Sequence, residues 1–346
     1  MNRKRAGKII AVISVIFVTW LILKSNFFIS NMGIGSRFKN FGVPFKRCMN
    51  IGNALEAPKD IPWDVEMKNE YFDVIKNAGF DAVRLPIRFS DYVNKAYYYK
   101  LDEDFMKKID SYIDYALNDD LIIIIDFHHF TEIMDEPESN KECFLSIWNQ
   151  LADRYKDYPR ELIFELLNEP QNNLEGELWN EYLSDGIKII RKIDKDRKII
   201  VGPDHYNSVD RLYELKLPKD DNLIVTFHYY EPNDFTFQGN IYHKGFENLK
   251  GIKWTGSDEE LSILKNKFEI ARKWSKTNKI GIFLGEFGAN RNAEEPYRKM
   301  WTGAVRKQAD EYDFAWGYWE LCSYFGIYDN ETGQWDKDVL SQLIPN

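Results

Sequence analysis

The stretch LIFELLNEPQ, residues 162–171, combines a buried strand with an abrupt polar end. Five of its first six residues are apolar, which is typical of a strand covered on both faces. Asn168 and Glu169 follow, and then Pro170, which cannot donate to a sheet ladder and disfavours the helical region for the residue before it. We therefore expect Glu169 to be extended at the carboxyl end of a strand, at the mouth of the fold.

Eight apolar or β-branched runs recur along the chain, and helical patterns separate most of them. The runs are Met49–Gly52, Ala82–Ile87, Leu121–Phe127, Leu162–Leu167, Lys198–Gly202, Leu223–His228, Ile280–Gly285 and Phe314–Trp319. The helical patterns are Val65–Asn77, Glu103–Asn118, Lys141–Tyr155, Leu178–Ile193, Glu259–Thr277 and Glu295–Tyr312, with a short one expected after Ser208 and another at Asp336–Leu343.

This alternation predicts an α/β fold with a parallel sheet covered by helices. Eight units in roughly 300 residues favour a closed (β/α)8 TIM barrel over an open doubly wound sheet. The open-sheet alternative lacks its signature, because no strand is followed by a G-x-G-x-x-G turn. We expect a single barrel domain over residues 47–346, preceded by a short spacer over residues 31–46.

The first thirty residues differ from the rest. Basic residues within the first eight positions precede an uncharged run, Ile9–Leu23, that Lys24 closes. The run is short for a membrane span of about 20 residues and resembles the apolar region of a signal peptide. Because no small-x-small cleavage site follows, we expect a signal anchor rather than a cleaved signal peptide, with the barrel outside the cell, either secreted or held at the cell surface.

Composition narrows the function further. Beyond residue 30 the chain has 41 basic and 55 acidic residues, a net charge of −14, which argues against a nucleic-acid partner. Aromatic residues make up 15%, enough for a core and also suited to stacking on sugar rings. The cysteines Cys48, Cys143 and Cys322 do not form a disulfide framework.

Polar or aromatic residues follow most of the predicted strands. Barrel active sites lie at the carboxyl ends of strands, and each such group costs free energy unless it is paired or solvated there. Read strand by strand, the ends give Asn53, Arg84, His128, His129, Asn168, Glu169, His228, Tyr230, Glu286, Trp319 and Glu320.

Single members of this set have ordinary structural explanations. Arg84 alone would more often be an ion-pair partner, and Tyr230 or Trp319 alone would be a rim or core aromatic. The pair His128-His129 could bind a metal, but the chain has no H-E-x-x-H or similar acid–histidine spacing. We therefore expect neither a metal nor a cofactor.

Two carboxylates on different strands, Glu169 and Glu286, favour one chemistry. Cleavage of a glycosidic bond needs one carboxyl group to protonate the leaving oxygen and another to attack or to activate water. The acid must keep its proton near neutral pH while its partner stays ionised. Arg84 beside Glu286 would keep Glu286 charged.

The motif LIFELLNEP resembles the signature of glycoside hydrolase family 5, also called cellulase family A. NIGNALEAP, VRLPIR, HHF, NEP, FHYY, GEFG and YWE follow in that family's order from Asn50 onward. The similarity is closest to bacterial endoglucanases of the branch that also acts on mannans. It implies a retaining endo-β-1,4-glycanase that acts on a β-1,4-linked polysaccharide, with water as second substrate and no cofactor.

The resemblance also implies residue roles. Glu169 matches the general acid/base and Glu286 the nucleophile. The site shell is matched by Arg84, His128, Asn168, His228, Tyr230 and Trp319, and the substrate-contacting positions by Asn53, Glu56, His129 and Glu320. Asn168 is expected to bond the sugar 2-hydroxyl. Phe237 stands where that branch is expected to carry a histidine, which bears on the mannan side of the specificity.

Alternatives remain at this stage. The same mechanism could act on mannan, glucomannan, xyloglucan or lichenan, and a barrel that only binds glycan is a rival of another class. A pure binder would not need both glutamates, and a Schiff-base aldolase barrel would need a lysine at a strand end, which we do not find. We expect a monomer. A retaining enzyme should hold the two carboxyl groups about 5–5.5 Å apart, with the face of Trp319 toward the gap.

Overall fold

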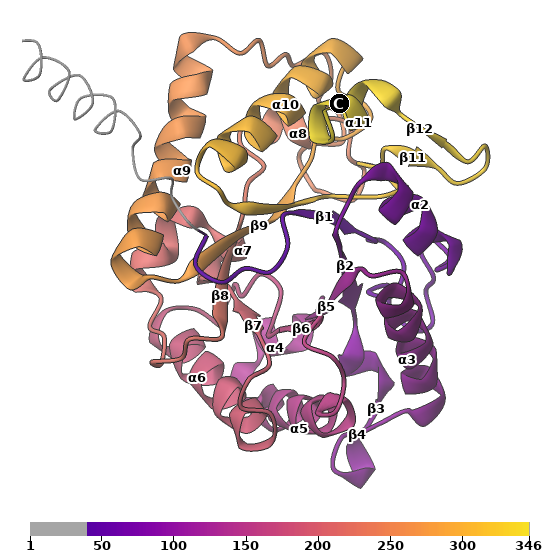
Figure 1. Cartoon of the computed structure of the whole chain (residues 1–346), viewed down its shortest axis with the longest axis vertical. Helices are drawn as coiled ribbons and strands as arrows, with labels where there is room; N and C mark the ends of the chain where they lie inside the picture. Colours follow the sequence, from indigo (N-terminus) through magenta and orange to yellow (C-terminus); the bar gives the residue numbers. More distant parts are fainter. Residues whose placement is uncertain (1–39, 346) are drawn as a thin grey trace, which may run out of the picture. The chain divides into compact units, whose positions relative to one another are not determined.

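A computed structural model describes residues 40–345, and its centre is a closed barrel of eight parallel strands (Figure 1). The strands are β1 (Arg47–Asn50), β2 (Ala82–Ile87), β5 (Ile122–Phe127), β6 (Leu162–Glu165), β7 (Ile199–Val201), β8 (Leu223–His228), β9 (Gly281–Phe287) and β10 (Ala315–Tyr318). Neighbours along the chain pair in parallel, and β10 pairs with β1 to close the ring. The predicted barrel is confirmed, with all eight strands at the predicted places.

The ring of strands is surrounded by helices (Figure 1). They are α2 (Glu70–Ala78), α3 (Glu103–Asn118), α5 (Pro137–Tyr155), α6 (Gly176–Ile193), α9 (Asp258–Asn278), α10 (Glu295–Glu311) and α11 (Lys337–Leu343). Between β7 and β8, where the sequence spacing is tight, the chain forms only the short α7 (Asp204–Asn207) and the 3-10 helix η3 (Val209–Glu214).

Side-chain caps fix the starts of α3 and α9. The side chain of Asp102 accepts a hydrogen bond from the Phe105 amide at the start of α3. In α9, Ser257 and Glu260 form a capping box, each side chain bonding the other's backbone amide. These signals are visible in the sequence, which explains why the predicted and observed bounds of both helices agree to within one residue.

Short elements in the loops were not predicted. They are η1 (Phe89–Tyr92), β3 (Val93–Asn94), η2 (Lys95–Tyr97), β4 (Lys100–Leu101), α4 (Thr131–Asp135), α7 (Asp204–Asn207), α8 (Asn233–Thr236), β11 (Tyr328–Asp329) and β12 (Gln334–Trp335). Each has five residues or fewer, too few to show a helical or strand period. The hairpin of β3 and β4 projects from the lower edge in Figure 1.

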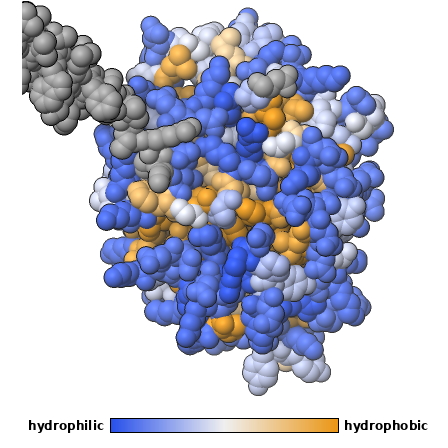
Figure 2. Space-filling model, viewed as in Figure 1, coloured by the Kyte–Doolittle hydropathy of each residue, from blue (hydrophilic) through white to orange (hydrophobic). Residues whose placement is uncertain are grey.

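One residue from every strand fills a layer inside the barrel. The layer consists of Cys48, Ala82, Ile124, Ile163, Ile200, Ile224, Phe283 and Ala315, all fully buried. Phe45 packs on this layer with its ring edge-on to Phe283, at 5.0 Å between centroids. Cys48 is therefore a core residue, and it is a free thiol, like Cys143 and Cys322. Outside, polar residues cover most of the face in Figure 2, and apolar residues gather toward its middle.

The predicted N-terminal segment, residues 1–30, lies outside the described residues. Part of the predicted spacer is described: Asn40 accepts a hydrogen bond from the Ile282 amide at 2.6 Å and donates to its carbonyl at 2.9 Å, so the chain joins β9 there. Within residues 40–345, we find no helix long and apolar enough to cross a membrane.

A fully buried arginine ties two connections together before β7. The guanidinium of Arg197 donates to the carbonyls of Tyr155, Pro159 and Leu162 at 2.5–2.9 Å, and its Nε contacts Asp194 at 3.1 Å. The carbonyls of Tyr155 and Pro159 each accept one backbone amide as well, from Tyr158 and Leu162. Removing the guanidinium would therefore take one donor from each of several buried acceptors, and would leave Asp194 with only Arg160 and two backbone amides.

Arg197→Met should lower the free energy of unfolding by about 3–5 kcal/mol, because it removes one partner of a buried ion pair. Arg160→Met is the matched control, since Arg160 binds the same Asp194 at 2.6 Å but is 53% exposed. Its loss should stay below about 1 kcal/mol. Urea unfolding of the two variants measures the difference, and equal losses would contradict the role given to Arg197.

Candidate active site

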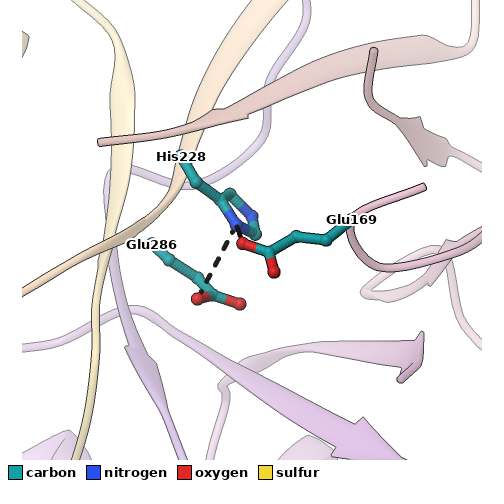
Figure 3. Close-up of side chains that lie close together, drawn as sticks. All are labelled: Glu169, His228 and Glu286. Atoms are coloured by element: carbon teal, nitrogen blue, oxygen red, sulfur yellow. Dashed lines mark hydrogen bonds and ion pairs between the residues drawn. The ribbon is translucent and has the colours of Figure 1, made fainter. Parts of the chain in front are cut away.

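Three side chains from different strands converge at the barrel mouth (Figure 3). Glu169 follows β6, His228 ends β8 and Glu286 lies in β9. One oxygen of each carboxylate and a ring nitrogen of His228 lie within 4.8 Å of one another. These two oxygens are thus close enough for the retaining arrangement, in which the carboxyl groups lie about 5–5.5 Å apart, and closer than the roughly 6.5–9.5 Å of inverting enzymes.

The backbone beside Glu286 allows this approach because residue 285 is glycine. A Cβ atom at Gly285 would lie 2.4 Å from Oγ1 of Thr226 and 2.9 Å from Nε2 of His228. The β8 and β9 strands also shift register next to His228, which pairs with Glu286. The glycine and the irregular pairing together bring the imidazole beside the carboxylate.

Glu169 does not have the extended backbone that the sequence predicts. Its φ is +47°, in the left-handed region, and the expectation drawn from Pro170 was wrong on this point. Such a backbone costs of order 1–3 kcal/mol and persists where surrounding contacts fix it. The Asn168 amide donates to the Phe127 carbonyl at 2.9 Å, and the Glu169 side chain meets Nδ1 of His228 at 2.7 Å.

Arg84 binds Glu286 from below. The two groups lie 2.8 Å apart, Nη1 to Oε1, and both side chains are nearly or fully buried. The hydroxyl of Tyr230 donates to the other oxygen, Oε2, at 2.8 Å. The predicted pairing of Arg84 with Glu286 is confirmed, and Tyr230 fixes the carboxylate's second oxygen.

Two buried carboxylates that the sequence analysis did not single out also face Arg84. Glu165 accepts from its Nε and Nη2 at 2.7 and 2.9 Å, and Asp126 lies 2.9 Å from Nη2. Asp126 and Glu165 are direct neighbours across β5 and β6. The available signal was an acid inside each apolar run, in IIIDF and LIFEL.

His128 links the buried carboxylate Asp126 to Asn168 and Trp319. Its Nδ1 is hydrogen-bonded to Asp126, and its Nε2 lies 3.2 Å from the Asn168 amide nitrogen. The Asn168 oxygen accepts from Arg84 at 2.8 Å. The indole of Trp319 lies parallel to the imidazole of His128, with ring centroids 5.7 Å apart. Trp319 is therefore oriented by His128, whereas the direction of its face toward a sugar stays a prediction.

The four positions predicted to contact substrate differ in burial. Glu56 is fully buried and accepts from the amides of Asn53 and Ala54, and Glu320 is fully buried and accepts from the amides of Cys322, Ser323 and Phe325. In this conformation both carboxylates organise loops rather than face solvent.

The remaining predicted positions lie nearer the surface. Asn53 and His129 are partly exposed with left-handed backbones, and His129 lies edge-on to Trp63 at 5.5 Å. Phe237 packs on Tyr230, at 5.0 Å between ring centroids. Sugar contacts of all these residues stay predictions.

Burial and neighbouring charge set the protonation of the site. Burial, reinforced by the charge of Glu165 and opposed by Arg84, raises the pKa of Glu169 to about 7. Burial also raises the pKa of Glu286, while His228 and Arg84 act to lower it. The pKa of His228 falls to about 4, chiefly through burial, so its imidazole is neutral near pH 7 and donates Nδ1–H to Glu169.

Glu169, His228 and Glu286 are also the donor types that could hold a metal ion. The same distances also fit a site of proton transfer and nucleophilic attack. Nδ1 of His228 lies 2.7 Å from Oε1 of Glu169 and 3.7 Å from Oε2 of Glu286. Each of the three is already engaged by a hydrogen bond. The expectation of a metal-free site stays a prediction.

Comparison with known proteins shows which family and which enzymes this chain is similar to. The family model described as cellulase, glycosyl hydrolase family 5, matches residues 47–325. Among curated relatives, Endoglucanase H of Acetivibrio thermocellus is 33% identical over 85% of this chain and 32% of its own length. This chain therefore spans about a third of that enzyme.

Solved structures cover the chain more completely. The Clostridial cellulose synthase subunit Z from Clostridioides difficile is 57% identical, with a TM-score of 0.86 over 87% of this chain and 99% of that one. Cel5A of Thermotoga maritima in complex with cellobiose is 46% identical, with a TM-score of 0.85 over 87% and 97%. A structure of Cel5A with mannotriose gives 45% and 0.84 over the same shares.

Glu169 should titrate near pH 7, because burial and the charge of Glu165 disfavour its ionised form. It should be protonated below this pH and ionised above it. Carbon-13 NMR of protein labelled at glutamate carboxyls, with Glu169→Gln for assignment, measures the transition. A midpoint near the ordinary 4.5 would contradict the electrostatic description.

Proposed function

The chain belongs to glycosyl hydrolase family 5, the cellulase family, and we propose that it is a retaining endo-β-1,4-glucanase. The observation that carries the proposal is the approach of Glu169 and Glu286 to within 4.8 Å across a barrel mouth. That separation suits direct attack by one carboxylate while the other delivers a proton.

In the first step, Glu286 attacks the anomeric carbon and forms a glycosyl ester. At the same time the protonated carboxyl of Glu169 gives its proton to the departing glycosidic oxygen. The pKa near 7 supports this role, because the proton is held at neutral pH and yet can be transferred. Arg84 and Tyr230 hold Glu286 in a fixed orientation and stabilise its charge before attack.

In the second step, the ionised Glu169 takes a proton from water, and the water oxygen attacks the anomeric carbon. The ester to Glu286 breaks, the carboxylate is regenerated, and the sugar leaves with its original configuration. His228 donates a hydrogen bond to Glu169 throughout and remains neutral, so it orients the acid/base without competing for its proton. One water is consumed for each bond cleaved, and both carboxyl groups return to their starting states.

We favour β-1,4-glucan as the polymer. Support comes from the endoglucanase relatives and from the cellobiose complex of Cel5A. The name of the C. difficile neighbour, a cellulose synthase subunit, further suggests cellulose made by the cell's own synthase as the substrate in vivo. Mannan or glucomannan is the alternative, supported by the mannotriose complex of Cel5A.

We also propose that residues 1–30 carry the enzyme to the outside of the cell as a signal anchor. The support is the sequence itself, in which basic residues precede the uncharged run Ile9–Leu23. An external location would give the barrel access to an extracellular β-glucan.

The wild-type chain should release reducing sugar from carboxymethylcellulose and regenerated amorphous cellulose faster than from glucomannan or xyloglucan, because the site is proposed to fit β-1,4-glucan. Glu286→Ala should abolish release, whereas Glu311→Ala, on the exposed side of α10, should not. A reducing-end assay measures all of these. Release from none of the polymers would contradict the proposed activity, and faster release from glucomannan would reassign the substrate.

A further inference from the structure

We propose that Glu165 is a positioning residue for hydrolysis, which fixes the guanidinium of Arg84 so that one nitrogen faces Glu286. The inference rests on the proposed retaining mechanism and assigns a role to a carboxylate that lies below the catalytic pair. It follows from the geometry of Arg84, from the strand that carries Glu165, and from the balance of buried charge.

The contact between Arg84 and Glu165 is bidentate. Nε and Nη2 of the guanidinium donate to the two carboxylate oxygens of Glu165 at 2.7 and 2.9 Å. A fork-to-fork pair of this kind fixes the plane of the guanidinium as well as its position. The remaining nitrogen, Nη1, therefore points to the opposite side, where it meets Glu286 at 2.8 Å and Asn50 at 2.9 Å.

The strand that carries Glu165 is held on both sides by neighbouring strands. Glu165 is the last residue of β6, is fully buried, and pairs with Asp126 of β5 and Ile200 of β7 in the barrel. Among residues 40–345, its side chain forms hydrogen bonds with Arg84 alone. Glu165 thus orients Glu286 through the guanidinium, and this indirect route separates it from residues that touch substrate.

Buried charge gives Glu165 a second effect. Asp126, Glu165 and Glu286 all lie within 3 Å of one guanidinium, so the cluster carries more negative than positive charge if all three are ionised. The negative charge of Glu165 also makes ionisation of Glu169 harder. Removing it should make Glu169 a stronger acid, and this effect is measurable apart from any loss of order.

Glu165→Gln keeps the shape of the side chain but removes its charge and one of its two acceptors. We expect kcat on a soluble cello-oligosaccharide to fall about tenfold or more with KM little changed, because Glu286 loses its fixed orientation. We also expect the basic limb of the kcat/KM profile to move to lower pH by roughly one unit, since a neighbouring negative charge is gone.

Glu165→Asp separates the orienting effect from the charge effect, because it keeps the negative charge but has a side chain that is one methylene shorter. It should lower kcat while leaving the basic limb in place. Asp194→Asn is the matched control: Asp194 is also a buried carboxylate paired with an arginine, Arg197, but that pair lies at the opposite, amino-terminal ends of the strands. It should lower stability and leave kcat and the pH profile of the folded fraction unchanged.

The outcomes are distinguishable. Wild-type-like kcat in folded Glu165→Gln would overturn the inference, as would an unchanged kcat with a loss of kcat/KM that comes entirely from KM. If Glu165→Gln does not fold, Glu165→Asp decides alone: reduced kcat with unchanged KM supports the role, and unchanged kcat overturns it. If the wild-type chain cleaves no β-glycan, the proposed function fails instead.

Discussion

The buried guanidinium of Arg84 is the interaction on which the mouth depends. It lies among three carboxylates, from Asp126, Glu165 and Glu286, and all four side chains are nearly or fully buried. A buried ion pair is stabilising only when its charges and hydrogen bonds are satisfied. Here one positive charge cannot balance three negative ones, so at least one carboxyl group has reason to keep a proton.

Asp126 is the group best suited to keep that proton. Burial, reinforced by Glu169 and opposed by Arg84, raises its pKa to about 7. Its Oδ1 has no hydrogen-bond partner among the described residues, while its Oδ2 meets His128 and Arg84. Near neutral pH, both Asp126 and Glu169 are therefore partly protonated. The protonation of Glu169 is thereby coupled to that of Asp126, which is fully buried.

The difference between the two mechanistic carboxylates follows from their partners. Glu286 has a cation at one oxygen and a tyrosine hydroxyl at the other, and both favour its ionised form. Glu169 has the neutral His228 as its hydrogen-bond partner, so burial is the largest influence on its pKa. Similar side chains acquire opposite roles because one lies beside Arg84 and the other does not.

The sequence predicted the barrel because each strand is a continuous apolar run, and it predicted Glu169 and Glu286 because both follow or end such runs. It could not predict the pairing of Asp126 with Glu165, which depends on register between β5 and β6. The left-handed backbone of Glu169 was missed because the proline rule is local, whereas contacts with His228 and Phe127 come from other strands. Glu56 and Glu320 were read as facing substrate, and only folded loops reveal the amides they bind.

Covalent trapping tests the central claim most directly. A cellobioside with fluorine at the sugar 2-position and a good leaving group should form the ester quickly and lose it slowly, because fluorine opposes the positive charge of the transition state. Mass spectrometry of the digested protein should then find the sugar on the peptide that contains Glu286. A label on Glu169 or Glu165, or turnover without any covalent species, would contradict the account.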